Sequence, residues 1–459
     1  MTNKLNSAIN FAHENENRFR DELIELVRIP SVSTDVEHKG DMQKAAEYLA
    51  NKLKGIGMNN VSIMPTGGHP VVYADFLTAG DDKPTVVIYG HYDVQPTDPI
   101  ELWESDPFAA EIRDGKLFGR GTSDMKGQVM ASIHAVEAWM KQGGMPINIK
   151  WLLEGEEEIG SPSLGKFIEN NKDLFACDFA LNPDGGILAE DLPTIPYSLR
   201  GLAYLELTLF GPAGDLHSGQ FGGAVLNPAN ELARLIGGMH DENGRITLPN
   251  FYDSVVELDD EERKELARLP QDEAFYLEQT GSPKLWGEKG YTPVEHTGGR
   301  PTLDVNGLLS GFTGEGSKTV LPAKAMAKIS MRLVANQDPI QVKKQLIQYI
   351  EENIRPGVTW TLDEHTGAKP SLTSRDSDGV KALAKAMETV WDVRPLYYRV
   401  GGSIPVVGQM MEILGVDSVM TGFGLPDDNL HAPNEKLTLG PWYKGIDTLI
   451  HFFANLVAN

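Results

Sequence analysis

Short apolar segments alternate with longer amphipathic ones through the first 200 residues of this 459-residue chain. Strands are expected at 61–64, 71–77, 85–89, 147–153 and 179–181. Helices are expected at 4–28, 41–56, 125–141 and 163–170. Strands that alternate with helices favour parallel pairing, because a parallel pair needs a long crossover connection. The sequence therefore predicts an α/β fold with a mainly parallel central sheet and flanking helices.

The pattern changes near residue 200. Further strands are expected at 204–210, 302–308, 324–334 and 358–362, and further helices at 228–239 and 339–354. This order is typical of a small α+β unit on an antiparallel sheet, and the α/β pattern resumes after about residue 370. We therefore expect residues 199–366 to be inserted into a domain made of residues 1–198 and 367–459. Residues 241–299 are acidic and irregular, and no element is predicted there.

Composition limits the possible partners and compartment. The formal net charge is −24, with 65 acidic and 41 basic residues, and such a surface disfavours binding to nucleic acid or to an anionic membrane. No apolar run is long enough to span a bilayer, and no secretory leader is apparent. Cys177 is the only cysteine, so no intramolecular disulfide can form. This suits a reducing compartment, and a cytoplasmic location is expected.

Four expected strands, at 85–89, 147–153, 179–181 and 416–421, are each followed by a side chain of a type that binds metal ions. These side chains are His91, the pair Glu157 and Glu158, Asp184, and His431, and Asp124 lies in a glycine-rich stretch between them. Sites in open α/β sheets form at the carboxyl ends of the strands. Any one of these residues alone has an ordinary explanation as a turn residue or a helix cap, but together they predict a metal site.

The ligand types indicate two ions rather than one. Two imidazoles, one shared carboxylate and two further carboxylates would give each ion nitrogen and oxygen ligands, which suit zinc, manganese or cobalt. Two such ions lie about 3.5–4 Å apart and activate a water between them. Asp93 is placed to hold the second nitrogen of His91. One of the adjacent glutamates must stay free to accept the proton of that water.

Three motifs carry a resemblance to a known family. They are Gly-His-Tyr-Asp-Val-Gln-Pro at 90–96, Gly-Arg-Gly-Thr-Ser-Asp-Met-Lys-Gly at 119–127, and Glu-Gly-Glu-Glu-Glu-Ile-Gly-Ser at 154–161. The chain resembles metallopeptidase family 20 in order over essentially its whole length, most of all the dipeptidase branch. That family contains carnosinase-type dipeptidases, glutamate carboxypeptidases, and desuccinylases and deacetylases of amino-acid biosynthesis. The resemblance implies Glu157 as general base and, as metal ligands, His91, bridging Asp124, Glu158, Asp184 and His431.

The resemblance also assigns roles in the inserted domain, which would be a lid and dimerisation domain. His217 resembles the histidine that reaches the partner's active site and stabilises the oxyanion. Thr319, Arg332 and Ser403 resemble contacts to the substrate carboxylate. From the residues alone, His217 is more often a residue of a local turn, and Arg332 is normally the solvent-facing member of a strand.

These observations predict a cytoplasmic, homodimeric hydrolase that cleaves dipeptides with two divalent ions per subunit, zinc being the first choice. The same scaffold would also suit a deacylase of N-acyl amino acids or a carboxypeptidase. A non-catalytic binding protein is disfavoured, because it would have no use for a general base at Glu157.

Overall fold

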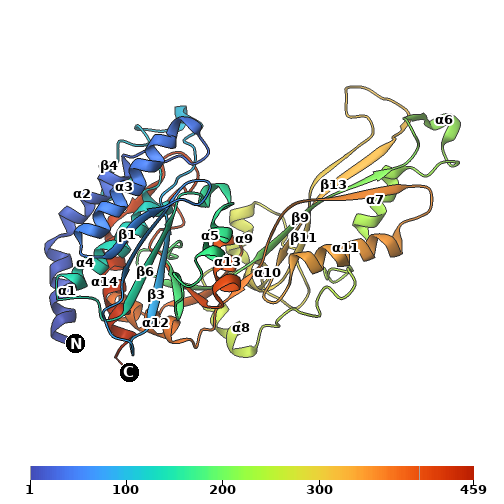
Figure 1. The fold of residues 1–459 in the computed structure, drawn as a ribbon. Coiled ribbons are helices and arrows are strands. Elements are labelled where there is room, and N and C mark those ends of the chain that lie inside the picture. The colour runs from blue at the N-terminus through green and yellow to red at the C-terminus, as the bar shows by residue number, and fades with distance from the viewer. Residues whose placement is uncertain (1, 403, 459) are drawn as a thin grey trace. The chain divides into compact units, whose positions relative to one another are not determined.

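The computed structural model describes residues 2–402 and 404–458, which separate into two compact units (Figure 1). The first unit contains Met1–Tyr197, Thr373–Tyr397 and Pro405–Asn459, and the second contains Ser198–Leu372 and Tyr398–Ile404. The second unit thus extends beyond the expected boundary at residue 366, because its last long strand continues to Ala368. It also includes Arg399, whose guanidinium lies 2.6 Å from the carboxylate of Glu262.

A six-stranded sheet forms the centre of the first unit, in the order β1-β2-β6-β3-β7-β17. The strands are β1 Asn59–Met64, β2 Val71–Phe76, β3 Thr85–His91, β6 Asn148–Glu154, β7 Phe179–Asn182 and β17 Asp417–Met420. β6, β3, β7 and β17 run parallel, and β2 is antiparallel to both of its neighbours. The predicted α/β class with a mainly parallel sheet is confirmed.

Helices cover both faces of this sheet (Figure 1). On one face α4 is buried at every position except Met140, and a Cβ added to Gly90 of β3 would lie 2.7 Å from its Val129. On the other face Tyr73 of β2 packs edge-on against Phe175, with ring centroids 5.7 Å apart, close to α5. The helices of this unit are α1 Thr2–Glu14, α2 Glu16–Val27, α3 Lys39–Gly55, α4 Gly127–Met140, α5 Leu164–Asn170, α12 Asp378–Trp391, α13 Pro405–Leu414 and α14 Leu439–Asn455.

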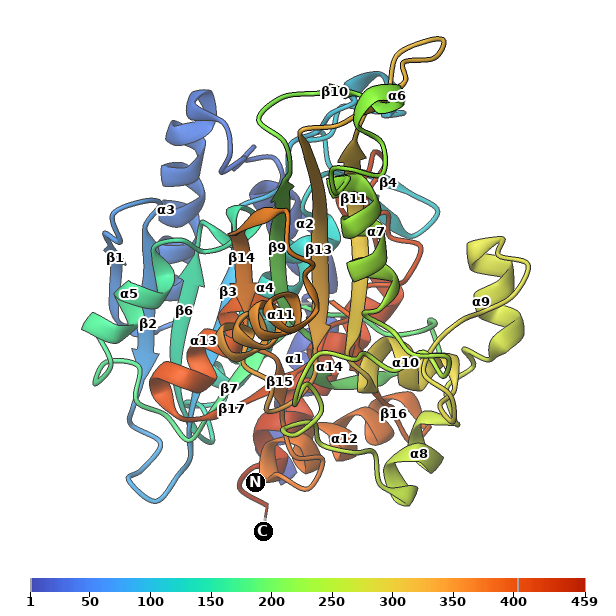
Figure 2. The ribbon, with the colours of Figure 1, turned by 90° about the vertical axis from the view of Figure 1, so that its right-hand side faces the viewer.

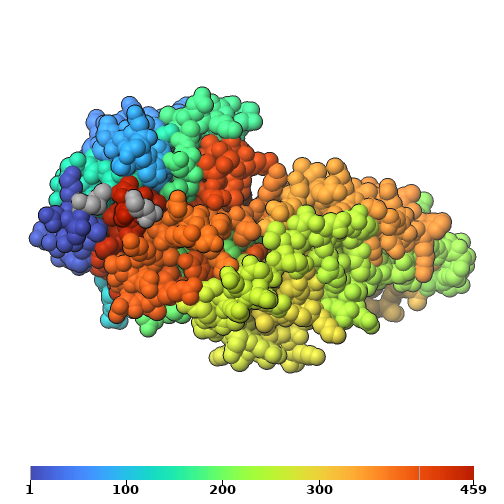
Figure 3. Space-filling model, turned by 90° about the horizontal axis from the view of Figure 1, so that it is seen from below, coloured from blue at the N-terminus to red at the C-terminus, as the bar shows by residue number. Residues whose placement is uncertain are grey.

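Two expected helices differ in their bounds. The expected helix 4–28 is divided at Asn15, whose side chain donates to the Phe11 carbonyl oxygen (2.8 Å) and so ends α1. The expected start at Met125 is also wrong, because Asp124 and Met125 have non-helical backbone angles and α4 begins at Gly127. α1 lies beside α14 in the view from below (Figure 3), with His13 Nε2 2.8 Å from an Asp447 carboxylate oxygen.

A small antiparallel sheet links two distant parts of the first unit. β4 Glu111–Arg113 and β5 Lys116–Phe118 form a hairpin, and β18 Lys436–Thr438 pairs with β5. Lys436 lies opposite Phe118 in this pairing. The pairing brings the segment before β18 next to the glycine-rich segment after β5.

The second unit contains a four-stranded antiparallel sheet in the order β11-β13-β9-β14, with α7 and α11 in front of it in Figure 2. β9 buries alternate residues, including Leu205, Leu207 and Leu209, as its apolar–polar alternation requires. The expected α+β class of this unit is confirmed. The elements are β9 Gly201–Phe210, α7 Pro228–Gly237, β11 Thr302–Ser310, β13 Lys324–Leu333, α11 Pro339–Asn353 and β14 Thr359–Ala368.

The segment 241–299, for which no element was predicted, contains three short helices. They are α8 Asp260–Leu266, α9 Glu273–Thr280 and α10 Pro293–Gly299. Shorter elements elsewhere are β8 Thr194–Leu199, β10 Leu216–His217, α6 Ser218–Phe221, β12 Val320–Leu321, β15 Ser371–Leu372 and β16 Leu396–Val400. In the described part of the chain, no helix has both the length and the apolar character that crossing a membrane requires.

Candidate metal centre

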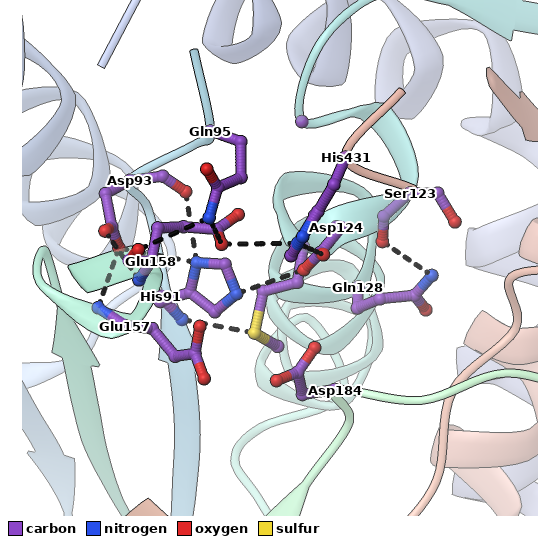
Figure 4. Close-up of polar contacts among 12 residues, drawn as sticks. His91, Asp93, Gln95, Ser123, Asp124, Gln128, Glu157, Glu158, Asp184 and His431 are labelled. Atoms are coloured by element: carbon purple, nitrogen blue, oxygen red, sulfur yellow. Dashed lines mark hydrogen bonds and ion pairs between the residues drawn. The ribbon is translucent and has the colours of Figure 1, made fainter. Parts of the chain in front are cut away.

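The site forms where β3 ends at the carboxyl edge of the central sheet (Figure 4). His91 is the last residue of β3 and is fully buried. Its Nδ1 lies 3.0 Å from the main-chain oxygen of Asp93, and its Nε2 lies 3.2 Å from a carboxylate oxygen of Asp124. The imidazole is therefore fixed at both nitrogens.

Asp124 lies between two imidazoles that are far apart in the sequence. One of its carboxylate oxygens is 3.2 Å from His91 Nε2, and the other is 3.0 Å from His431 Nε2. Burial alone would raise the pKa of Asp124, but the hydrogen bonds from His431 and His91 outweigh burial and hold this pKa well below its usual range. One carboxylate thus faces two separate sets of side chains.

These side chains make two groups of candidate ligands that share Asp124. The first group contains His91, Asp124 and Asp184, and the second contains Asp124, Glu158 and His431. Within each group, one ligand atom of each residue lies within 4.8 Å of those of the other two. Burial and the charge of Asp124 raise the pKa of Asp184 well above its usual value. A divalent ion would offset this crowding of carboxylates, and imidazole nitrogens and carboxylate oxygens are suitable ligands for such an ion. The residues present therefore fit a metal centre.

Asp93 has a larger structural role than expected. Its carboxylate accepts hydrogen bonds from the main-chain N–H groups of Glu157 (3.2 Å) and Glu158 (3.0 Å). The carboxylate is 3.4 Å from Nδ1 of His91, whereas the Asp93 main-chain oxygen is closer. Asp93 therefore positions both the imidazole and the loop that carries the two glutamates.

The two adjacent glutamates differ in their surroundings. Glu158 lies 3.3 Å from His431 Nε2 and accepts a 2.8 Å hydrogen bond from the side chain of Gln95. Glu157, among the described residues, belongs to neither ligand group. Burial raises the pKa of Glu157 to about 7, and the charge of Glu158 adds to the increase, while His91 opposes it.

A third group of metal-ligand types lies between α2 and α4, and it was not predicted. It contains Glu22, His134 and Glu137. Lys52 Nζ lies 2.6 Å from Glu22, and Arg18 lies 3.1 Å from Glu137. Because both carboxylates are already paired with cations, this group is an internal ion-pair cluster rather than a metal site.

Two acidic residues next to the ligands, Asp428 and Glu435, were also missed by the sequence analysis, and Gln95 appeared there only as part of a motif. Asp428 accepts a 2.7 Å hydrogen bond from the Ser123 hydroxyl, and Glu435 accepts hydrogen bonds from the segment that contains Asp124. Lone acidic residues in a polar loop usually face solvent, so only their closeness in sequence to His431 could have drawn attention to them.

The candidate residues of the second unit lie in two places. His217, which is exposed, ends β10 opposite Val320, and the main-chain oxygen of Thr319 accepts from Ser218 N–H (3.1 Å). His217 Nδ1 also accepts from Gly219 N–H (2.9 Å) and so caps α6, which is the local role of a turn residue. Arg332 lies near the end of β13, and Ser403 lies outside the described residues.

Comparison with known proteins adds independent information. The family model described as "Peptidase family M20/M25/M40" matches residues 87–457. A Cys-Gly metallodipeptidase of Candida albicans is 31% identical, with 95% of this chain and 94% of that protein covered. The human Beta-Ala-His dipeptidase is 32% identical, with 84% of this chain and 77% of that protein covered.

Solved structures agree. An M20 family metallo-carboxypeptidase of Sulfolobus solfataricus is 34% identical with a TM-score of 0.80, and the match covers 95% of this chain and 98% of that one. The resemblance to metallopeptidase family 20 is thereby confirmed. With its metal-ligand groups at the carboxyl edge of the sheet, the chain belongs to peptidase family M20/M25/M40 and is a metal-dependent peptidase.

Proposed function

We propose that this peptidase hydrolyses dipeptides at a centre that holds two divalent ions. The observation that carries the proposal is the Asp124 carboxylate, with one oxygen 3.2 Å from His91 and the other 3.0 Å from His431. His91, Asp124 and Asp184 would hold one ion, and Asp124, Glu158 and His431 the other. Zinc is the proposed ion, with manganese or cobalt as alternatives, because the ligands are imidazoles and carboxylates.

A bound divalent ion supplies Lewis-acid chemistry, since it polarises a carbonyl group and lowers the pKa of water. Glu157 accepts a proton from the attacking water and passes it to the departing amine. Burial raises the pKa of Glu157 to about 7 when no ion is bound, and bound cations would lower it, so the carboxylate is ionised and can accept a proton near neutral pH. Asp93 holds the imidazole of His91 through its main-chain oxygen, and it holds the loop of Glu157 through its carboxylate.

The proposed substrate class rests on the relatives. A Cys-Gly metallodipeptidase and a Beta-Ala-His dipeptidase both exceed 30% identity to this chain, which supports dipeptides. Arg332 would bind the terminal carboxylate of the substrate with its planar guanidinium, together with Ser403. Thr319 lies beside His217 and would contact that carboxylate from the partner subunit. The alternative is a carboxypeptidase, which the 34% identity to the Sulfolobus enzyme favours; a deacylase of N-acyl amino acids is a further alternative.

We also propose that the protein is a homodimer in which His217 stabilises the oxyanion in the partner's site. His217 lies near the Lys324 end of β13, and Arg332 is eight residues further along that strand. At about 3.3 Å per residue, Lys324 and Arg332 lie roughly 25 Å apart, and His217 pairs with Val320, which precedes Lys324 in the sequence. A single dipeptide could not contact both His217 and Arg332 in one subunit, which supports a site shared between two subunits.

The edge of the second unit's sheet supports the same proposal. β11 is an edge strand with exposed apolar side chains, including Leu308 (62% exposed), Leu309 (55%) and nearby Phe312 (46%). An exposed apolar edge strand is a surface that readily pairs with another chain. A second copy of this chain is the proposed partner. Light scattering at several protein concentrations would test this, and a monomer throughout would exclude it.

The location proposed is the cytoplasm. The single cysteine, Cys177, supports a compartment in which thiols stay reduced, and it is only partly buried. Cell fractionation with markers for each compartment would test the location.

Two measurements together test the proposed function. Metal analysis of active protein should give two divalent ions per subunit, and chelation should remove the activity. A panel of dipeptides, longer peptides and N-acyl amino acids, assayed with zinc, manganese and cobalt, should show highest kcat/KM for dipeptides. Preference for longer peptides cleaved from the carboxyl end would instead establish the carboxypeptidase, and one ion or none at saturation would refute the two-ion centre.

A further inference from the structure

The carboxylate of Glu435 accepts hydrogen bonds from the main-chain N–H groups of the segment that carries Asp124. Glu435 is fully buried. One of its oxygens accepts from the N–H groups of Ser123 (3.0 Å) and Asp124 (3.1 Å). The other accepts from Gly121 N–H (2.9 Å) and from an Arg120 guanidinium nitrogen (2.8 Å). Four donors converge on this single side chain, and one of them belongs to the residue shared by both ligand groups.

Strand pairing fixes Glu435 in this position. The residue directly precedes β18, which pairs with β5, and the Glu435 main-chain oxygen accepts from Gly119 N–H (2.9 Å). The side chain therefore enters the turn between β5 and Asp124 from a rigid strand. Gly121 in this turn has φ +84°, a left-handed conformation that glycine adopts without steric cost.

The same loop also carries His431, in an unfavourable backbone conformation. His431 has φ +59°, and Asn429 and Asn434 are left-handed as well. Asparagine adopts the left-handed conformation readily, but a histidine does so at a steric cost, so the loop requires support from outside it. Asp428 supplies part of that support by accepting from the Ser123 hydroxyl (2.7 Å), and Asn434 bonds to the main chain of Leu102 (2.9 Å) and Glu104 (2.8 Å). Glu435 connects the other end of the loop to the Asp124 segment.

We propose that Glu435 is a positioning residue that holds the Asp124 segment and the His431 loop at the separation one metal ion requires. The ion concerned is the one assigned to Asp124, Glu158 and His431, so the inference rests on the proposed two-ion function. Glu435 touches neither ion nor substrate. It acts by fixing the main chain of Asp124 on one side and the loop of His431 on the other. Outer partners of this kind typically affect metal affinity by about 10–100-fold.

Glu435→Gln is the direct test. Glutamine has nearly the same shape, but its NH₂ group would face two N–H donors instead of accepting from them, so about half of the bonds are lost. Metal-free protein, prepared with a chelator, is titrated with zinc by calorimetry. The expected result is two binding steps for the wild type and, in the variant, one step weakened by about 10–100-fold. Excess zinc should restore most of kcat, with KM little changed.

Glu231→Gln in the second unit is the matched control. Glu231 is also buried and accepts from an arginine side chain (Arg234) and from a main-chain N–H group (Arg355, 2.9 Å). It should lower the unfolding temperature without changing zinc affinity. Where Glu435→Gln does not fold, Glu435→Asp keeps the charge but shortens the side chain, and it should show a smaller loss of zinc affinity.

Unchanged zinc affinity in the folded Glu435 variant, with a fall in unfolding temperature like that of the control, would overturn the positioning role. This outcome is distinct from failure of the proposed function. If the wild type itself binds only one ion, the two-ion function is wrong, and the role of Glu435 is then decided by whether its variant weakens that one ion.

Discussion

Three adjacent glutamates in the first unit should respond to the same substitution in three different ways. Glu156 accepts from His69 N–H (2.9 Å) and Ser163 N–H (3.2 Å), and so holds two loops together. Glu158 belongs to a ligand group that contains His431, and Glu157 does not. Changing each glutamate to glutamine therefore separates a structural, a catalytic and a ligand role within three residues.

The largest loss of turnover at full metal occupancy is expected for Glu157→Gln. An amide cannot accept the proton of the attacking water, and removal of a general base costs about 10²–10⁴ in rate, or about 3–5 kcal/mol. The pKa of Glu157 is raised to about 7 by burial before any ion is bound. Bound cations favour the ionised carboxylate and lower that pKa, so kcat/KM of the wild type should rise with pH through a value below 7.

The assay combines pH profiles with metal analysis of all three variants. Glu157→Gln should keep both ions and lose the acidic limb of the profile. Glu158→Gln should lose an ion, and its activity should depend on added metal. Glu156→Gln should cost about 1–3 kcal/mol of stability through a lost hydrogen bond but leave the activity of folded protein unchanged. Loss of an ion from Glu157→Gln but not from Glu158→Gln would show that the two roles are assigned in the wrong order.

Three further results are expected. Asp124→Ala should lose both ions together, and metal analysis that finds one ion fully retained would contradict the shared carboxylate. Mixing His217→Ala subunits with Glu157→Gln subunits should restore activity, because one site of a mixed dimer carries neither change; no recovery after verified subunit exchange would refute a shared site. Burial raises the pKa of Glu137, but contacts with its cationic neighbours lower it overall to about 2. The ionised Glu137 therefore stabilises the fold fully above pH about 5, and this effect is lost towards pH 2. In urea unfolding, the free energy of unfolding of Glu137→Gln should be lower than that of the wild type at pH 5, and the difference should shrink towards pH 2.

Local pattern was sufficient to predict the strands that deliver the ligands. The apolar run after Thr85 predicts β3, and the polar residues that follow must then lie at the carboxyl edge of the sheet. The three helices between residues 241 and 299 were missed although each has a cap. Asp259, Asp272 and Thr292 all accept a hydrogen bond from a main-chain N–H group of the helix that follows. Those caps were readable in the sequence, but the helices are short and their apolar periodicity is weak.

Contacts between distant segments could not be predicted in this way. Glu435 and Asp124 are 311 positions apart, and their hydrogen bond exists only because β18 pairs with β5. The division between α1 and α2 at Asn15 could not be predicted either, because the residues on both sides favour a helix. Only the hydrogen bond from the Asn15 side chain to the Phe11 carbonyl oxygen shows it. Residue types and spacing identified the candidate ligands, while the residues that hold them depend on tertiary structure.

The divided first unit has a consequence for synthesis of the chain on the ribosome. His431 is made 247 residues after Asp184, and at roughly 5–20 residues per second about 10–50 s separate the two. During this interval the carboxylates of the site exist without their second imidazole, so a nascent chain can hold metal only weakly. β7 also keeps an unpaired edge until β17 is made and adds beside it. The growing chain therefore exposes an open sheet edge for as long as it lacks a complete metal centre.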